Sequence, residues 1–281
     1  MSKHSLLAVF AHPDDELSVG GTLAHYARAG ASAHLICATR GEVGEAPPDL
    51  KGFTSIGEMR ADELQCASNI LGLESVNFLG YRDSGMPGSP DNAHPQSLVS
   101  APMVEVAQKV AAHIRRCKSQ VVITFDPIGG YRHPDHIAIH QATVAAFQIA
   151  GDAAQEIEGL PPYVPQKLYF VVFARGFLRA AVRLLRLVGQ DPSHFGKNKD
   201  VDLASLVQVD YPTHARIDIR DVFAQKERAT ACHASQMAGM GGRPAQLVMR
   251  IFSSSETLMR AIPAEPPAHV EHDLFEGIAE R

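Results

Sequence analysis

Residues 5–16 read Ser-Leu-Leu-Ala-Val-Phe-Ala-His-Pro-Asp-Asp-Glu, an apolar run that stops abruptly at a polar turn. A short apolar run bounded by turn residues is typical of a strand that is buried on both faces of a sheet. A second run, residues 121–125, is followed by Tyr-Arg-His-Pro-Asp-His at 131–136. The carboxyl ends of parallel strands share one edge of a sheet, where α/β proteins assemble their reaction sites. We therefore expect the two histidine–aspartate segments to meet at that edge.

The first 175 residues alternate such runs with stretches whose apolar residues recur at helical spacing. The pattern predicts strands at 5–11, 32–38, 75–79, 120–125 and 167–173, and helices at 17–29, 55–71, 101–117 and 137–149. Strand–helix–strand alternation indicates an α/β fold of Rossmann-like type, a mostly parallel sheet with helices on both faces.

The pattern is less regular after residue 175. It predicts a basic, apolar helix at 176–189, strands at 205–210 and 215–219, helices at 220–235 and 243–260, and an irregular tail from 261. Because no repeat or low-complexity linker interrupts the chain, we interpret residues 1–281 as one domain. In this interpretation, residues 1–175 form the α/β core and residues 176–281 a C-terminal elaboration.

Composition narrows the class of protein. A net charge of −5 offers no basic surface for nucleic acid. The first apolar run is too short and too closely followed by charge for a signal peptide or a transmembrane segment. The four cysteines, none of them in a CxxC pair, favour free thiols in a reduced, cytoplasmic protein. A secreted protein whose signal has been removed remains an alternative, and the oligomeric state is open, a homo-oligomer included.

The two histidine–aspartate segments carry the donors of a metal site. In His12-Pro13-Asp14-Asp15, adjacent carboxylates can point to different sides of a tight turn, so that one binds metal and the other takes a proton from water. In His133-Pro134-Asp135-His136, the proline suits the first turn of a helix, and both histidines share a face. One histidine can then bind metal while the other, held by Asp135, acts as an acid or an oxyanion stabiliser. Two histidines and one carboxylate are a typical open Zn²⁺ set, which Fe²⁺ also accepts.

Two competing interpretations are weaker. His140 is four residues beyond His136 and could share a metal with it, but residue 137 is isoleucine and the HExxH glutamate is missing. A packing role for His140 is favoured. Gly20-Gly21 lacks the GxGxxG pattern of a dinucleotide site. The chain is thus expected to be a metal-dependent hydrolase.

Motifs along most of the chain resemble the LmbE/PIG-L family of zinc-dependent N-deacetylases. The matching stretches are Ala11–Glu16, Thr39–Glu42, Arg60–Glu63, Leu71-Gly72, Asp83–Gly85, Gly129–His136, Lys226 and His233–Gln236. Residues 126–136 look most like the mycothiol-pathway branch, which contains a deacetylase and an S-conjugate amidase. The two histidine–aspartate motifs are the specific ones, whereas Asp-Ser-Gly and His-x-Ser-Gln mean little alone.

The resemblance implies a zinc site with three protein ligands, namely His12, Asp15 and His136. It implies that Asp14 is the general base. His133, polarised by Asp135, would stabilise the tetrahedral intermediate and protonate the leaving amine. Tyr131 would donate a hydrogen bond to the oxyanion.

The resemblance also implies substrate contacts by Arg60, Asp83 and His233. The ordinary alternatives are a solvated helix residue, a turn residue and a packed histidine, respectively. The expected reaction is removal of the N-acetyl group from a small N-acetylglucosaminyl conjugate, with an activated water as nucleophile. An amidase acting on a larger acyl group, such as a thiol S-conjugate, is the alternative within enzymes. A metal-binding or sugar-binding module without turnover is the alternative outside them, and Asp14 argues against it because a pure binder needs no spare carboxylate.

Overall fold

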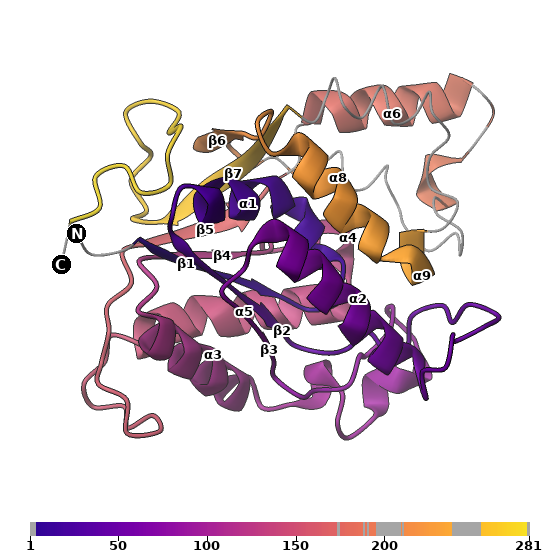
Figure 1. The fold of residues 1–281 in the computed structure, drawn as a ribbon, viewed down its shortest axis with the longest axis horizontal. Coiled ribbons are helices and arrows are strands. Elements are labelled where there is room, and N and C mark those ends of the chain that lie inside the picture. Colours follow the sequence, from indigo (N-terminus) through magenta and orange to yellow (C-terminus); the bar gives the residue numbers. More distant parts are fainter. Residues whose placement is uncertain are drawn as a thin grey trace.

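The computed structural model describes residues 4–172, 175–187, 189, 191–194, 209, 211–237 and 254–279. Seven strands form one sheet that lies between two layers of helices (Figure 1). The strands are β1 (Ser5–Phe10), β2 (Ser32–Cys37), β3 (Ser75–Phe78), β4 (Val121–Thr124), β5 (Lys167–Val171), β6 (Ala215–Asp218) and β7 (Ser255–Ile262).

The order of the strands is β3-β2-β1-β4-β5-β7-β6. Strands β1 to β5 pair in parallel, and β7 runs antiparallel to both β5 and β6. The chain moves outward from β1 to β3 on one side and from β4 to β5 on the other, so the order switches between β1 and β4. Loops leave such a switch point in opposite directions and open a crevice at the carboxyl ends of the strands. The predicted Rossmann-like, mostly parallel sheet is confirmed.

Helices cover both faces of the sheet (Figure 1). On one face lie α1 (Gly20–Arg28), α2 (Ile56–Leu71) and α8 (Phe223–Cys232), and on the other α3 (Met103–Cys117) and α5 (Pro134–Ile149). The remaining helical segments are α4 (Gly129–Arg132), α6 (Arg175–Leu187), α9 (Ala234–Met237), and the 3-10 turns η1 (Asp15–Ser18), η2 (Pro90–Ala93), η3 (Leu98–Ser100) and η4 (Pro192–His194). Among the described residues, no helix combines the length and the apolar character needed to cross a membrane.

Two helix starts lie close to the switch point, and local sequence fixes both. Helix α2 begins after Ser55, whose hydroxyl accepts a hydrogen bond from the backbone N–H of Glu58 at 3.1 Å. Helix α5 begins with Pro134, and the His133 ring caps it by accepting from the backbone N–H of Asp135 at 3.2 Å. The caps fix where each helix begins, and therefore where its first side chains point.

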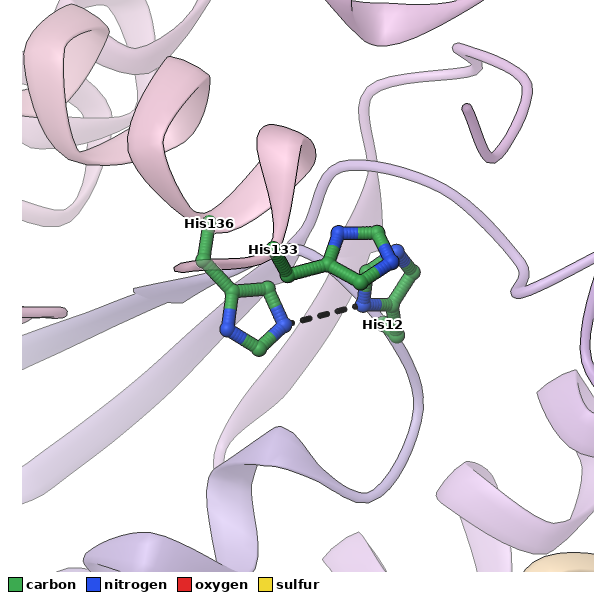
Figure 2. A group of neighbouring side chains, drawn as sticks. All are labelled: His12, His133 and His136. Carbon is green, nitrogen blue, oxygen red and sulfur yellow. Dashed lines mark hydrogen bonds between the residues drawn. The ribbon is translucent and has the colours of Figure 1, made fainter. Parts of the chain in front are cut away.

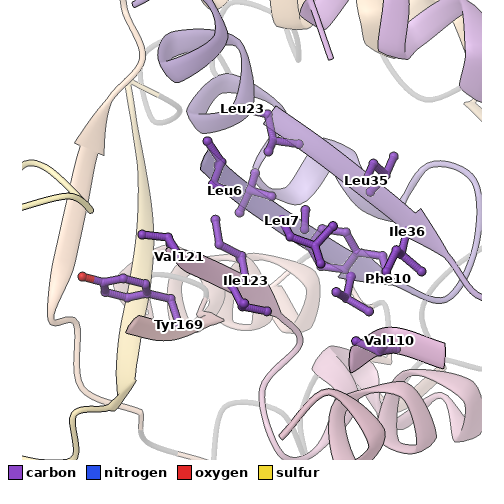
Figure 3. Close-up of a cluster of buried hydrophobic side chains, with 14 of the residues drawn as sticks. Leu6, Leu7, Phe10, Leu23, Leu35, Ile36, Val110, Val121, Ile123 and Tyr169 are labelled. Atoms are coloured by element: carbon purple, nitrogen blue, oxygen red, sulfur yellow. The ribbon is translucent and has the colours of Figure 1, made fainter. Parts of the chain in front are cut away.

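Buried apolar side chains pack around β1 and β4 and hold the ends of these two strands in place (Figure 3). Leu6, Phe10 and Ile123 are fully buried, as is every residue of both strands. Each large apolar side chain buried in this way contributes roughly 1.5–3 kcal/mol. The strand ends, and the polar turns attached to them, are thus held by the best-packed part of the molecule.

The prediction of a helix at 243–260 is wrong in its second half, where the chain forms strand β7, which pairs with β5 on one side and β6 on the other. Its inward residues are Glu256 and Leu258, and the buried glutamate breaks the apolar alternation that marks a strand. Glu256 is accommodated because its carboxylate accepts the N–H groups of Gly21 and Thr22 at the start of α1, at 2.9 and 2.7 Å. Residues 243–253, and all of 205–210 except residue 209, lie outside the described part of the chain.

The tail after β7 is mostly irregular, as predicted, but it packs against the chain's own sheet. Glu271 is buried, and its carboxylate lies 2.8 Å from Lys167 Nζ, 2.6 Å from the Tyr169 hydroxyl and 2.6 Å from a guanidinium nitrogen of Arg260. Leu274 is also fully buried. These contacts attach the tail to β5 and β7.

The prediction of four free cysteines is wrong for one pair. Cys66 of α2 and Cys232 of α8 form a disulfide, whereas Cys37 and Cys117 are free. The pair is separated by 166 residues, so no local spacing could have indicated it. Disulfides are rare in cytosolic proteins, and the cytoplasmic location stays a prediction.

Candidate metal centre and active site

The turn that follows β1 has an unusual backbone. Asp14 adopts the left-handed conformation with φ of 102°, which is uncommon for any residue except glycine. The N–H of His12 donates to Asp15 Oδ2 at 2.7 Å, and the N–H of Asp14 donates to Glu16 Oε2 at 2.9 Å. The two adjacent aspartates consequently face different neighbours, as the sequence predicted: Asp15 faces histidines and Asp14 faces an arginine.

Three donor groups from the two histidine–aspartate segments form a small triangle. His12 Nδ1 lies 3.2 Å from His136 Nε2 and 3.4 Å from Asp15 Oδ2, and His136 Nε2 lies 3.3 Å from Asp15 Oδ1. Figure 2 shows the two rings approaching each other from the turn after β1 and from the start of α5. Zinc ligands at about 2.0–2.1 Å in tetrahedral geometry stand about 3.3–3.4 Å apart. The spacing of the two nitrogens, and of each nitrogen from one oxygen of the Asp15 carboxylate, is therefore that of neighbouring ligands on one zinc ion.

The outer nitrogen of each ring already has an acceptor. His136 Nδ1 lies 3.2 Å from the carbonyl oxygen of Gly129, and His12 Nε2 lies 3.1 Å from Asp135 Oδ2. If each outer nitrogen carries its proton, the two inner nitrogens present lone pairs to each other at 3.2 Å. Such a contact is repulsive unless a cation lies between them, and histidines that bind metal are typically oriented in this way. The donors present therefore fit Zn²⁺ or Fe²⁺.

Two other groupings of neighbouring donors exist among the described residues, and they are His12, His133, His136 and His12, Asp83, Asp135. Neither is as free to bind metal. His133 Nδ1 accepts the backbone N–H of Asp135, as described above. Both carboxylate oxygens of Asp83 accept backbone N–H groups, and both of Asp135 contact Ser84. Asp15 accepts the His12 N–H on Oδ2 but directs Oδ1 toward His136. The triangle of His12, His136 and Asp15 is the better candidate.

Asp135 has different contacts from those expected. Its carboxylate contacts His12 Nε2 together with the backbone N–H and the hydroxyl of Ser84, and only its backbone N–H touches His133. Asp135 is the second residue of α5, and its side chain points toward the turn after β1. Asp135 thus orients His12 and does not polarise His133.

His133 is buried beside the triangle. Its ring centroid lies 4.6 Å from that of His12 and 4.9 Å from that of His136 (Figure 2). Burial, together with the charge that these two rings can carry, lowers the pKa of His133 to about 2. Since Nδ1 accepts a hydrogen bond, the proton of the neutral ring is on Nε2. His133 can therefore donate a hydrogen bond from Nε2.

The loop before α5 brings Tyr131 to the same place. Asp126 Oδ1 accepts the N–H groups of Ile128 and Gly130 at 3.0 and 2.9 Å, which folds the loop. Gly129 has φ of +65°, and a Cβ there would lie 2.8 Å from the His136 Cβ, so this close approach requires glycine. Tyr131 is 36% exposed, and its ring centroid is 4.9 Å from that of His136. A substrate at the triangle would meet its side chain.

Arg60 is neither a solvated helix residue nor aimed at the crevice. It is 5% exposed, and its guanidinium donates to the carbonyl oxygens of Pro13 at 2.7 Å and Gly41 at 2.9 Å. It also lies 3.4 Å from Asp14 Oδ2. Burial raises the pKa of Asp14 to about 7, although Arg60 opposes this shift. Arg60 therefore supports the turn that carries Asp14.

Asp83, His233 and His140 are buried around this centre. Asp83 Oδ1 lies 3.5 Å from His12 Nε2; burial opposes ionisation, but the contact with His12 holds the pKa of Asp83 well below its usual value. His233 is fully buried, with Nε2 2.6 Å from Glu16 Oε1. His140 contacts the carbonyl oxygen of Phe125 at 2.8 Å, in keeping with the packing role favoured for it. The substrate contacts expected of Arg60, Asp83 and His233 stay predictions.

Two residues at the site were not given a site role from the sequence. Ser84, which holds Asp135, was visible only as the middle residue of a weak Asp-Ser-Gly motif. Glu16 joins His233 to the backbone of Asp14. The sequence signal for Glu16 was its place as the third acidic residue in a row, since one metal ligand and one base account for only the first two.

Comparison with a family model and with curated relatives gives one family. The family model described as PIG-L, GlcNAc-PI de-N-acetylase, matches residues 7–147. A 1D-myo-inositol 2-acetamido-2-deoxy-α-D-glucopyranoside deacetylase from Thermobifida fusca is 40% identical over 257 residues, covering 86% of this chain and 87% of that protein. A protein of the same name from Acidothermus cellulolyticus is 36% identical and covers 98% of this chain and 95% of its own. The crystal structure of the conserved protein TT1542 from Thermus thermophilus superposes with a TM-score of 0.62 at 27% identity, covering 92% of this chain and 95% of that one.

The matched family stretch contains both histidine–aspartate segments, and hence all three corners of the donor triangle as well as Asp14. The deacetylase relatives extend well beyond it, over most of the chain. Motif, geometry and relatives agree, and this chain belongs to the PIG-L family of N-deacetylases, enzymes that hydrolyse an amide bond.

Proposed function

We propose that the protein removes the acetyl group from N-acetylglucosamine α-linked to a small polyol, with 1D-myo-inositol as the leading aglycone. The names of the relatives that cover most of the chain support this substrate class. We further propose His12, Asp15 and His136 as the ligands of a Zn²⁺ ion. The observation that carries the proposal is the triangle of donors at 3.2–3.4 Å with the carboxylate of Asp14 beside it and outside it.

A zinc ion in this position would lower the pKa of a bound water and polarise the scissile carbonyl. The chain's own groups supply the rest. Asp14 takes the proton of the attacking water, which is the task of a carboxylate whose pKa is close to neutrality. Arg60, at 3.4 Å from Asp14 Oδ2 and hydrogen bonded to the Pro13 carbonyl oxygen, keeps that carboxylate in place.

The developing negative charge on the carbonyl oxygen needs hydrogen-bond donors. His133 offers Nε2–H, because its Nδ1 is occupied by the backbone N–H of Asp135. Tyr131, which is partly exposed and lies against His136, offers its hydroxyl. Since the Nε2–H of His133 is used here for the oxyanion, we assign the return of the proton to Asp14, which has taken it from water. The acid role expected of His133 stays a prediction.

An acetate-release assay with several substrates tests this function. We expect N-acetylglucosamine linked to inositol to be turned over faster than the malate-linked, lipid-linked and free sugars, and faster than an amide with a larger acyl group. Turnover should stop after chelation and return with added Zn²⁺ or Fe²⁺, whichever the enzyme uses. Faster hydrolysis of the larger acyl amide would establish the amidase alternative instead.

Asp14→Asn provides the matching variant. It should keep stoichiometric metal and lose about 10²–10⁴ in kcat, the usual contribution of a positioned acid–base group. Metal analysis and kcat are measured on the same preparation. Loss of the metal from this variant would show that Asp14, and not Asp15, is the ligand.

A further inference from the structure

Asp14 is held in a conformation that it would not adopt by itself. Its φ of 102° lies in the left-handed region, where a residue with a Cβ is strained, and such strain persists only where the surroundings impose it. Asp14 is the N-cap of the 3-10 turn η1, but its side chain makes no capping hydrogen bond there. The restraint must therefore come from other contacts of the Asp14 backbone and its neighbours.

The contact on the backbone side passes through Glu16. Glu16 Oε2 accepts the Asp14 N–H at 2.9 Å, and Glu16 Oε1 lies 2.6 Å from His233 Nε2. Both side chains are buried, with exposures of 1% for Glu16 and 0% for His233. A buried carboxylate is stable only when its oxygens are paired, so His233 fixes the position of Glu16, and Glu16 fixes the N–H of Asp14.

His233 is itself anchored. It follows the last residue of α8, Cys232, whose disulfide to Cys66 joins α8 to α2. Helix α2 also carries Arg60, which holds the other side of the turn through the Pro13 carbonyl oxygen and the Asp14 carboxylate. The turn is thus held on two sides by two helices that are covalently linked and pack against each other.

We propose that Glu16 and His233 are positioning residues for Asp14, and that the Cys66–Cys232 disulfide anchors them. They act by keeping the Asp14 backbone left-handed, so that its carboxylate faces the reacting water while Asp15 faces the metal. The proposal rests on the proposed role of Asp14 as the base. It predicts that disturbing His233 changes catalysis without touching either the metal or the substrate.

The test compares His233→Leu with His233→Gln, whose amide N–H can replace Nε2 as a donor to Glu16. Because misplacing a catalytic group by about 1 Å can cost about 100-fold, we expect His233→Leu to lower kcat about 10–100-fold. Metal stoichiometry and KM should stay within about two-fold of wild type, and His233→Gln should recover most of the kcat. His34→Leu is the matched control, since it also removes a buried histidine, one that contacts the Ser75 hydroxyl at 2.9 Å. It should lower thermal stability with no loss of kcat.

Equal kcat in wild type and His233→Leu, alongside an inactive Asp14→Asn, would overturn the positioning role while leaving the proposed function intact. A wild-type enzyme that releases no acetate would instead overturn the proposed function. If His233→Leu does not fold, Glu16→Gln replaces it: a kcat loss at unchanged KM supports the proposal, and wild-type kcat overturns it. For the anchor, a Cys66→Ser/Cys232→Ser variant should lose kcat at unchanged metal content. Wild-type kcat in that variant would show that the disulfide has no part in positioning.

Discussion

The contacts of Asp135 lead to a sharp prediction about metal affinity. Its carboxylate accepts from His12 Nε2 at 3.1 Å and from the Ser84 N–H at 2.9 Å, and it also contacts the Ser84 hydroxyl. In Asp135→Asn one acceptor oxygen becomes an NH₂ group. His12 Nε2 and the Ser84 N–H both contact Oδ2, so the amide oxygen takes that place and the NH₂ group donates to the Ser84 hydroxyl. His12 then keeps its tautomer, but its outer partner is a neutral amide and no longer a carboxylate, which makes the inner nitrogen a weaker metal ligand.

Mutation of an outer hydrogen-bond partner of this kind typically weakens metal binding 10–100-fold, or about 1.4–2.7 kcal/mol. We expect Asp135→Asn to fall in this range when the zinc Kd is measured by competition with a chromophoric chelator. At saturating zinc, its kcat should approach that of wild type. Ser84→Ala is the control, because it leaves the carboxylate on His12 and should weaken zinc binding less.

The reasoning fails if Asp135→Asn binds zinc as tightly as wild type and nevertheless loses kcat at saturating zinc. That result would place the effect of Asp135 on His133, the partner that the sequence alone suggested. The two roles are separable because one changes the zinc Kd and the other changes only kcat.

Two further predictions concern the ligand set and stability. His136→Ala should lose stoichiometric metal while His140→Ala retains it, and the reverse pattern in metal analysis would mean that the ligand is misassigned. Burial raises the pKa of Glu271, but hydrogen bonds from Lys167 and Tyr169 outweigh it and hold the pKa below its usual value. A carboxylate with a lowered folded pKa stabilises the fold above its unfolded pKa of about 4.3, and this contribution is lost as pH falls through the folded pKa. Glu271→Gln should therefore lower the free energy of unfolding by about 2–3 kcal/mol at pH 7, and this difference from wild type should shrink in acid. Urea titrations that give the same difference at every pH would refute the prediction.

Strands β1 and β4 were predictable because each buries an unbroken apolar run that ends at turn residues. β7 was not, because its inward Glu256 is compatible with burial only when the start of α1 lies against it. That contact joins residues more than 200 positions apart. The Cys66–Cys232 disulfide has the same character, since only the packing of α2 on α8 brings the two sulfurs together. Pairings of this kind depend on tertiary structure and leave no periodic signal.

The site shows a similar division. The residue types after β1 and before α5 predicted that the two histidine–aspartate segments would meet, because both segments leave neighbouring strands at the same edge. The choice of His12, Asp15 and His136 as ligands came from the family resemblance. Which atoms meet was beyond the pattern. Asp135 follows His133 by only two residues, yet its carboxylate contacts the ring of His12. Arg60 likewise donates to the Pro13 carbonyl oxygen in the turn after β1. Sequence places donors at an edge, whereas orientation depends on side chains that arrive from other elements.

The choice of aspartate at position 14 follows from the same geometry. The side chains of Asp14 and Asp15 must contact different partners. The left-handed backbone at Asp14 reverses the chain so that Asp15 Oδ2 accepts the His12 N–H at 2.7 Å. Glycine would adopt this conformation freely but supplies no base. Of the residues that carry a carboxylate, aspartate is the one enriched in the left-handed region, since its short side chain tolerates that backbone. Glutamate at this position would fit the turn less well and would place its carboxylate one methylene further along the side chain. The carboxylate would then no longer be held in the position that separates the base from the metal ligand.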